Sequence, residues 1–230
     1  MTEIERIERQ WKHKDVHDPD FFYFSQLAGQ PGLFIDVGGN RGQSAASVRV
    51  VWPECAIASF EPNPLVVPAL SHIAKILGRM QVHNVALGMA EHETTLLLPW
   101  VDGQPFLEQG TIAPEQFERQ WIIDGFAQHG QHLSTTEMRV NVHRLDTFGL
   151  TPMAMKVDAE GSELAVLQGA EETLRRHQPV LMVENNDWGR VTEFLSTLGY
   201  ACFRYIHEDQ RLVPFFGQNT NAFYVAAQLV

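Results

Sequence analysis

Acidic side chains stand at the ends of several short apolar runs in this sequence. Asp36 lies at the end of the first run, and Glu61, Asp158 and Glu184 close three later ones. Short apolar runs bounded by turn residues are typical of buried parallel strands. Because parallel strands bring their carboxyl ends to one edge of a sheet, we expect these carboxylates to lie close together. Such a group could bind a cation, accept hydrogen bonds from hydroxyls or take up a proton.

The first run leads into a glycine-rich turn, Asp36-Val37-Gly38-Gly39-Asn40-Arg41-Gly42. Glycine lets a ligand approach the backbone closely. The Gly-x-Gly-x-x-Gly spacing of dinucleotide sites is absent, and a carboxylate at Asp36 would repel a pyrophosphate. The turn therefore favours a ligand that carries an amino or sulfonium cation, such as S-adenosylmethionine (SAM). The alternative is a turn without a ligand.

The elements that must position these residues alternate between strand and helix. We expect strands over 33–37, 56–60, 80–86, 153–158, 179–183, 200–206 and 221–226, and helices over about 43–51, 65–77, 162–177 and 190–198. This order predicts an α/β fold with a doubly wound, mostly parallel sheet of seven strands. The last two strands have no helix between them, which indicates an antiparallel edge strand.

Two segments lie outside this pattern. Residues 1–30 form a predicted helical arm, in which Thr2 and Glu5 match a capping box and the aromatic residues 21–24 pack onto the sheet or form a lid. Residues 31–230 form the main domain, with an irregular insertion at about 99–136 that includes a short helix over 114–126. Strands at 94–98 and 138–143 are expected to pair on either side of it.

Composition excludes several classes of function. The net charge of −11 argues against binding to nucleic acid, which depends on clustered Lys and Arg. Two cysteines provide neither a disulfide framework nor a metal motif, and they suit a reducing compartment. The charged N-terminus does not resemble a signal peptide, and no apolar run is long enough to span a membrane. We therefore expect a cytoplasmic protein.

Several separate motifs resemble the FkbM family of SAM-dependent methyltransferases. They recur in the family's order, at 36–42, 60–64, 84–88, 144–148, 156–163 and 166–170. The resemblance implies a class I methyltransferase (Rossmann-like) fold, SAM as donor and O-methylation of a sugar or secondary metabolite. Gly39 stands where the family more often has alanine, a difference expected to change little. The insertion is not a shared motif, so the resemblance does not identify the acceptor.

The resemblance also assigns roles around the donor. Asp36 and Gly38 are expected to contact the methionine moiety, Asn40 and Gly42 to shape the turn, and Glu61 to hold the ribose. Asn84, Val85 and Ala86 are expected to flank the adenine. For Asn84, capping of the strand end is an equal alternative.

Methyl transfer to a hydroxyl benefits from a base or a metal. Asp158 is the first candidate for the base and His143 the second, and Glu160 is a further candidate because it lies in a shared motif. Lys156, inside an apolar run, is expected to pair with Asp36 or Asp158.

A metal site is a second possibility at the same strand ends. If their strands are adjacent, Asp158, Glu184 and Asn185 would present an oxygen set suited to Mg²⁺. Hydrogen-bonded strand-end caps are the interpretation that we favour over this metal site.

The sequence thus predicts a SAM-dependent O-methyltransferase with a small-molecule acceptor. An NAD(P)-dependent oxidoreductase and a non-catalytic SAM-binding protein are the alternatives. The acceptor and the oligomeric state do not follow from the sequence.

Overall fold

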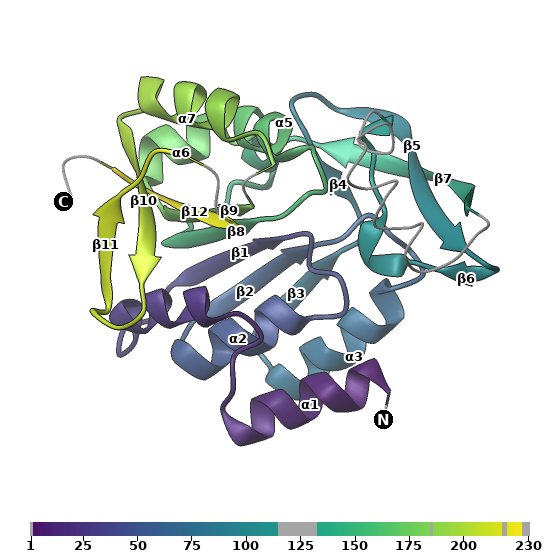
Figure 1. The fold of residues 1–230 in the computed structure, drawn as a ribbon, viewed down its shortest axis with the longest axis horizontal. Helices are drawn as coiled ribbons and strands as arrows, with labels where there is room; N and C mark the ends of the chain where they lie inside the picture. Colours follow the sequence, from purple (N-terminus) through teal and green to yellow (C-terminus); the bar gives the residue numbers. More distant parts are fainter. Residues whose placement is uncertain (1, 115–132, 185, 218–219, 227–230) are drawn as a thin grey trace.

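The computed structural model describes residues 2–114, 133–184, 186–217 and 220–226. Its centre is an eight-stranded sheet in the order β11-β10-β12-β9-β8-β1-β2-β3 (Figure 1). The strands are β1 (Leu33–Val37), β2 (Ala56–Phe60), β3 (Met80–His83), β8 (Ala154–Val157), β9 (Val180–Glu184), β10 (Tyr200–Ile206), β11 (Arg211–Pro214) and β12 (Asn221–Ala226). The predicted α/β fold with a doubly wound, mostly parallel sheet is confirmed.

The antiparallel end of this sheet differs from the expectation of seven strands. Residues 211–214, expected to be a connection, form an eighth strand that pairs with β10 at the edge. The antiparallel strand β12 is internal, because it lies between β9 and β10. Six consecutive buried residues in β12 reflect this internal position.

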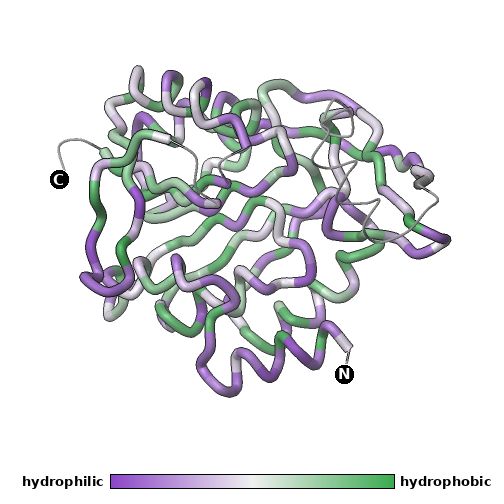
Figure 2. The backbone as a smooth tube through the Cα atoms, in the orientation of Figure 1, coloured by the Kyte–Doolittle hydropathy of each residue, from purple (hydrophilic) through white to green (hydrophobic). Residues whose placement is uncertain are grey.

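Helices cover both faces of the sheet, and each face has its own core. One face carries α1 (Glu3–His13), the 3-10 segment η1 (Pro19–Leu27), α2 (Gln43–Val51) and α3 (Val67–Leu77); the other carries α5 (Glu163–Gln168), α6 (Glu171–His177) and α7 (Trp188–Thr197) (Figure 1). Successive strand residues alternate between the cores, so Phe34 packs on the α2 face and Ile35 on the α7 face. Figure 2 shows hydrophobic residues along the central strands and a mixed pattern along α1.

The helix expected over 162–177 is broken into α5 and α6 at Gly169. A Cβ atom at this position would overlap the carbonyl oxygen of Gly88. The backbone of the 84–88 motif therefore packs directly against the helix junction. Periodicity alone does not reveal such an approach of two distant segments.

The N-terminal arm packs onto the sheet, as the aromatic residues predicted. The Phe24 ring lies 5.2 Å from that of Phe34 and 6.1 Å from that of Phe223, centroid to centroid. Thr2 caps α1 in a capping box with Glu5, which confirms that motif. The arm is thus a structural part of the α2 face.

A second, four-stranded sheet stands beside the carboxyl end of the main one (Figure 1). It contains β4 (Ala86–Leu87), β5 (His92–Val101), β6 (Gln104–Pro105) and β7 (Leu133–His143). The strand expected over 80–86 is therefore interrupted, because Ala86 pairs with β7 while Met80–His83 stays in the main sheet. The β5–β7 hairpin extends into both ends of the predicted insertion, and the helix expected over 114–126 lies largely outside the described residues. Among the described helices, none has the length and apolar character required to cross a membrane.

Candidate active site

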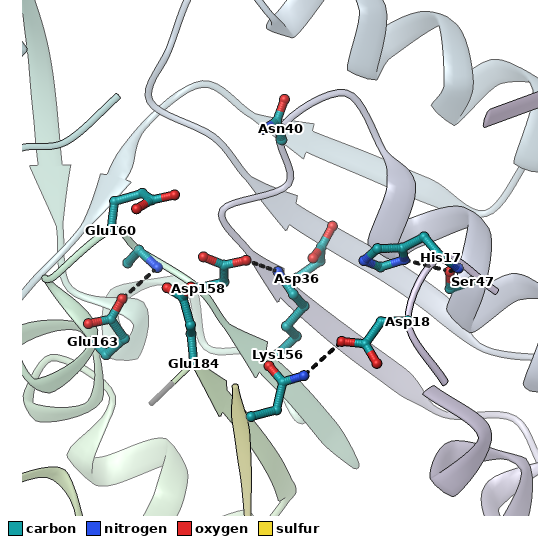
Figure 3. Close-up of polar contacts among 12 residues, drawn as sticks. His17, Asp18, Asp36, Asn40, Ser47, Lys156, Asp158, Glu160, Glu163 and Glu184 are labelled. Carbon is teal, nitrogen blue, oxygen red and sulfur yellow. Dashed lines mark hydrogen bonds and ion pairs between the residues drawn. The ribbon is translucent and has the colours of Figure 1, made fainter. Parts of the chain in front are cut away.

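A cavity of about 840 Å³ opens at the carboxyl ends of β1, β2, β8 and β9. Its floor includes the glycine turn, and its walls include residues of α1 and of the segment 107–112. Glu61, Asp158, Glu160 and Glu184 all line it. The strand-end carboxylates therefore converge as the parallel topology predicted, and Figure 3 shows the last three close together.

The glycine turn depends on close packing inside the protein. Gly38 has φ +77°, and a Cβ atom there would overlap the carbonyl oxygen of Asp158. Gly42 also has a positive φ, +102°, and it precedes α2. The turn thus needs glycine at both positions, and it presents Gly38 and Asn40 to the cavity.

Gly39 has less space around it than its resemblance to the family's more common alanine suggested. A Cβ atom there would overlap Ser59 Oγ, which donates a hydrogen bond of 3.0 Å to Asp36. An alanine at this position therefore requires Ser59 to move. We therefore expect alanine at this position to have a larger effect than the sequence suggested.

We expect Gly39→Ala to lower the free energy of unfolding by about 1–3 kcal/mol, because it overpacks a buried site. Ser59→Ala removes the clashing hydroxyl, so the double variant should lose less stability than the sum of the single variants. Urea denaturation of the four proteins measures this coupling. Strict additivity would show that the two side chains do not compete for space.

Asp36 lies beneath the turn rather than in the cavity. It is fully buried, and its Oδ1 has no hydrogen-bond partner. Burial raises the pKa of Asp36, and the facing Lys156 opposes this rise. Asp36 does not belong to the cavity lining, and its predicted contact with a methionine moiety stays a prediction. Its carboxylate lies under the turn, where it accepts the hydrogen bond from Ser59.

Glu61 presents its carboxylate to the cavity from the end of β2. Its two oxygens accept hydrogen bonds of 2.8 Å from the backbone N–H groups of Asn40 and Asn63. Burial raises the pKa of Glu61 to about 7, although these two donors oppose the rise. The second lone pairs of both oxygens are available to ligand hydroxyls.

The predicted adenine segment divides into two parts. Val85 and Ala86 line the cavity. Asn84 instead donates hydrogen bonds of 2.8 and 3.1 Å to the carbonyl oxygens of Glu61 and Pro62. Asn84 therefore caps the end of β2, which agrees with the second of its two predicted roles, and a contact of its backbone with adenine stays a prediction.

Lys156 forms an ion pair with Asp158 inside the site, with 2.8 Å between Nζ and Oδ2. This was one of the two predicted pairings. Burial lowers the pKa of Lys156, but Asp158 and Asp36 outweigh burial and raise it. Burial raises the pKa of Asp158, but Lys156 outweighs it and holds that pKa below its usual range. Asp158 is therefore a weak proton acceptor, and its charge orients Lys156.

Glu160 has a different environment from Asp158. Burial, then the charges of Asp158 and Glu163, raise the pKa of Glu160 to about 8. Its backbone has φ +47°, which is unusual for a residue with a side chain, and its carboxylate accepts a 3.1 Å hydrogen bond from Gln109. Unlike that of Asp158, the pKa of Glu160 lies near neutral pH, which suits a group that accepts a proton.

Of the other predicted groups, Glu184 lines the cavity beside Asp158 (Figure 3). His143 does not line the cavity, and its Nδ1 lies 3.7 Å from a carboxylate oxygen of Glu91. Burial and neighbouring acids raise the pKa of Glu184, and its Oε2 accepts a hydrogen bond from Asn186. Asn185 is outside the described residues. Within the described chain, no group of three His, Cys, Asp or Glu side chains is arranged to hold a metal ion.

The sequence did not identify the upper wall of the cavity. Gln10 and His17 of the N-terminal arm line it, as do Gln109 and Ile112. The segment 107–112 is fixed by Arg41, which pairs with Glu108, and by a hydrogen bond from Thr111 Oγ1 to the Glu160 carbonyl. No local pattern marks these residues, because they reach the site only through tertiary packing.

Known proteins resemble this chain in sequence and in fold. "Methyltransferase 1" of Beauveria bassiana (strain ARSEF 2860) is 25% identical over 184 residues, which cover 73% of this chain and 69% of that protein. "Methyltransferase sdnD" of Sordaria araneosa is 24% identical over 189 residues, which cover 74% and 71%. Methyltransferase FkbM from Methylobacillus flagellatus KT superposes with a TM-score of 0.58 at 18% identity, over 93% of this chain. This chain spans about half, 49%, of that structure's chain.

The family model described as "Methyltransferase FkbM domain" matches residues 36–202, from the glycine turn to β10. This match contains every motif on which the resemblance in the sequence rested. The chain belongs to the FkbM methyltransferase family.

Proposed function

We propose that this protein transfers a methyl group from SAM to a hydroxyl group of a small acceptor, a sugar or a secondary metabolite. The observation that carries the proposal is a single cavity lined by both the glycine turn with Glu61 and the group Asp158, Glu160 and Glu184. The first set suits a nucleoside with a cationic tail. The second set suits a hydroxyl that must lose a proton.

The residues present fit SAM. A volume of about 840 Å³ lies within the range of small-molecule sites and leaves room for an acceptor beside the donor. Asn40 Oδ1 is buried at the cavity floor without a hydrogen-bond partner, so it can accept from an ammonium group. Glu61 can accept from ribose hydroxyls, and the surrounding carboxylates favour a sulfonium over a pyrophosphate.

The chain's own residues then act on the acceptor. SAM supplies a reactive methyl group, so correct placement of the acceptor oxygen contributes much of the rate. In this proposal Glu160 accepts the hydroxyl proton as the oxygen attacks, and Asp158 holds the Lys156 ammonium in place. The wall formed by 107–112 helps exclude water from the transfer.

Titration of the purified protein with SAM and with NADH by calorimetry tests the donor. We expect SAM to bind and NADH not to bind. NADH binding without a response to SAM would instead support a nicotinamide-dependent oxidoreductase.

A panel of sugars, glycosides and catechols with radiolabelled SAM then tests the transfer. A labelled product that carries the methyl group on oxygen is expected. SAM binding without transfer to any compound of the panel would support a non-catalytic SAM-binding protein. The same assay in EDTA, with and without added Mg²⁺, decides whether a metal at Asp158, Glu184 and Asn185 contributes; activity that EDTA leaves unchanged would remove the metal.

A further inference from the structure

Three polar groups meet at the hydroxyl of Ser47, on the buried side of α2. The backbone N–H of His17 donates to Ser47 Oγ at 3.0 Å, and Gln10 Nε2 donates to it at 2.8 Å. The His17 ring nitrogen Nδ1 lies 2.8 Å from the same oxygen (Figure 3). Both partners of Ser47 belong to the N-terminal arm.

The number of available lone pairs decides the direction of the third bond. A serine hydroxyl has two acceptor positions and one proton to donate. The two N–H donors from His17 and Gln10 occupy both acceptor positions. The Ser47 proton must therefore go to His17 Nδ1, which places the ring proton on Nε2.

The His17 ring is neutral as well as fixed. His17 is an exposed residue, yet desolvation of its ring, then the charge of Lys156, lower its pKa to about 4. The neutral ring is therefore favoured over the imidazolium at pH 7. The ring packs against Phe21, with centroids 4.9 Å apart, which limits its rotation.

The free edge of this ring faces the cavity. His17 lines the cavity together with Lys156 and Asp158, and Figure 3 shows the ring edge opposite Ser47 directed toward these two residues. Nε2 is the ring nitrogen of His17 that the contact with Ser47 leaves unused. The arm thus presents this nitrogen to the cavity, beside the ion pair of Lys156 with Asp158.

We propose that His17 is a specificity-determining residue, whose Nε2–H donates a hydrogen bond to an oxygen of the methyl acceptor. This inference rests on the proposed function, and it narrows the substrate class. The acceptor would carry a second oxygen besides the hydroxyl that is methylated, as a polyol, a sugar or a hydroxy-carbonyl compound does. A ring that carries its proton on Nε2 cannot take up the hydroxyl proton there, so His17 is a binding group rather than the base.

The tautomer can be measured without any acceptor. Long-range ¹H–¹⁵N correlation spectra of protein labelled at histidine distinguish the two neutral tautomers and the imidazolium. We expect the His17 signals, assigned by their loss in His17→Gln, to report Nε2–H between pH 6 and pH 8. Ser47→Ala should relax this preference. A ring with the proton on Nδ1, or an imidazolium at pH 7, would overturn the proposal.

Kinetics on a methylated compound of the panel test the contact itself. We expect His17→Phe, which keeps an aromatic ring beside Phe21, to raise the KM for the acceptor about tenfold and to leave the Kd of SAM unchanged. His17→Gln should restore most of the affinity, because its amide nitrogen can replace Nε2–H. His13→Phe is the matched control, since His13 does not line the cavity.

Two further outcomes separate the proposals. A wild-type KM in His17→Phe would show that the ring does not touch the acceptor. If the wild-type protein methylates no compound of the panel, the proposed function fails, whereas a ring with the proton on Nδ1 would refute the role of His17 whatever the panel shows.

Discussion

Replacement of Glu61 by glutamine is expected to raise the Kd of SAM roughly 30- to 150-fold. The carboxylate is already fixed by the backbone N–H groups of Asn40 and Asn63, so it can accept from ribose hydroxyls without reorganisation. Loss of the charge weakens those bonds by about 2–3 kcal/mol. Calorimetric titration with SAM measures the change.

The pH dependence of SAM binding gives a second, independent readout. Because the pKa of Glu61 is raised to about 7, this group is partly protonated near neutral pH in the free protein. Ribose hydroxyls and a sulfonium cation favour the carboxylate, so SAM affinity should rise as the pH increases through 7. In Glu61→Gln this dependence should disappear.

A matched variant separates the binding effect from loss of structure. Glu54→Gln also removes a carboxylate that accepts a backbone N–H bond, from Gly29, but it lies outside the cavity. We expect it to bind SAM as the wild-type protein does. Unchanged affinity in Glu61→Gln would remove Glu61 from the donor site.

The parts of the site that could be predicted from sequence depend on topology. Parallel strands fix where their ends meet, and therefore the sequence predicts that Glu61, Asp158, Glu160 and Glu184 lie together. Their different pKa values could not be predicted in this way. Asp158 is paired with Lys156 and Glu160 is not, and that difference is set by tertiary contacts.

The sequence pattern also does not predict how deeply a strand-end side chain is buried. Asp36 and Lys156 are register partners in adjacent strands, and of the two predicted pairings the ion pair that Lys156 forms is the one with Asp158. However, the turn that follows β1 folds back over Asp36 and buries it. The sequence pattern of a strand-end acid is the same whether its side chain lies in the ligand cavity or beneath it.

The His17–Ser47 contact is a third feature that the sequence does not predict. The two residues are 30 positions apart, and each has an ordinary local role, one in a polar linker and one in a helix. The packing of the arm on the sheet, to which Phe24 and the hydrogen bond from Asn221 to Asp18 contribute, brings them together. A single sequence therefore indicated an arm and an aromatic anchor, but not a cavity wall.

Glu160→Gln is expected to lower kcat about 100-fold or more while the Kd of SAM changes little, because the variant removes the proton acceptor and not the donor site. A base must be ionised to act, and the pKa of Glu160 is raised to about 8. The wild-type kcat/KM for the acceptor should therefore rise about tenfold per pH unit below 8 and level off above it. The variant should lack this slope.

The same variant should be more stable than the wild-type protein at pH 8. The folded-state pKa of Glu160 is raised above its ordinary value of 4.5, so the folded state holds the proton more tightly than the unfolded chain. Stability from this group is thus greatest below pH 4.5 and is lost as the pH rises to about 8. Glutamine does not ionise, so the Tm of Glu160→Gln should exceed that of the wild-type protein by about 2–5 °C at pH 8 and by less at pH 5.

Loss of activity together with a gain in stability distinguishes a base from a residue that only maintains the fold. Glu171→Gln on α6 removes a carboxylate outside the cavity, and it should leave kcat and its pH dependence unchanged. If Glu160→Gln keeps the wild-type pH slope, the proton must go elsewhere, and Glu184, whose pKa is also raised, becomes the group to replace next. If it loses both activity and stability, Glu160 serves chiefly to fix the wall at Gln109 rather than to accept the proton.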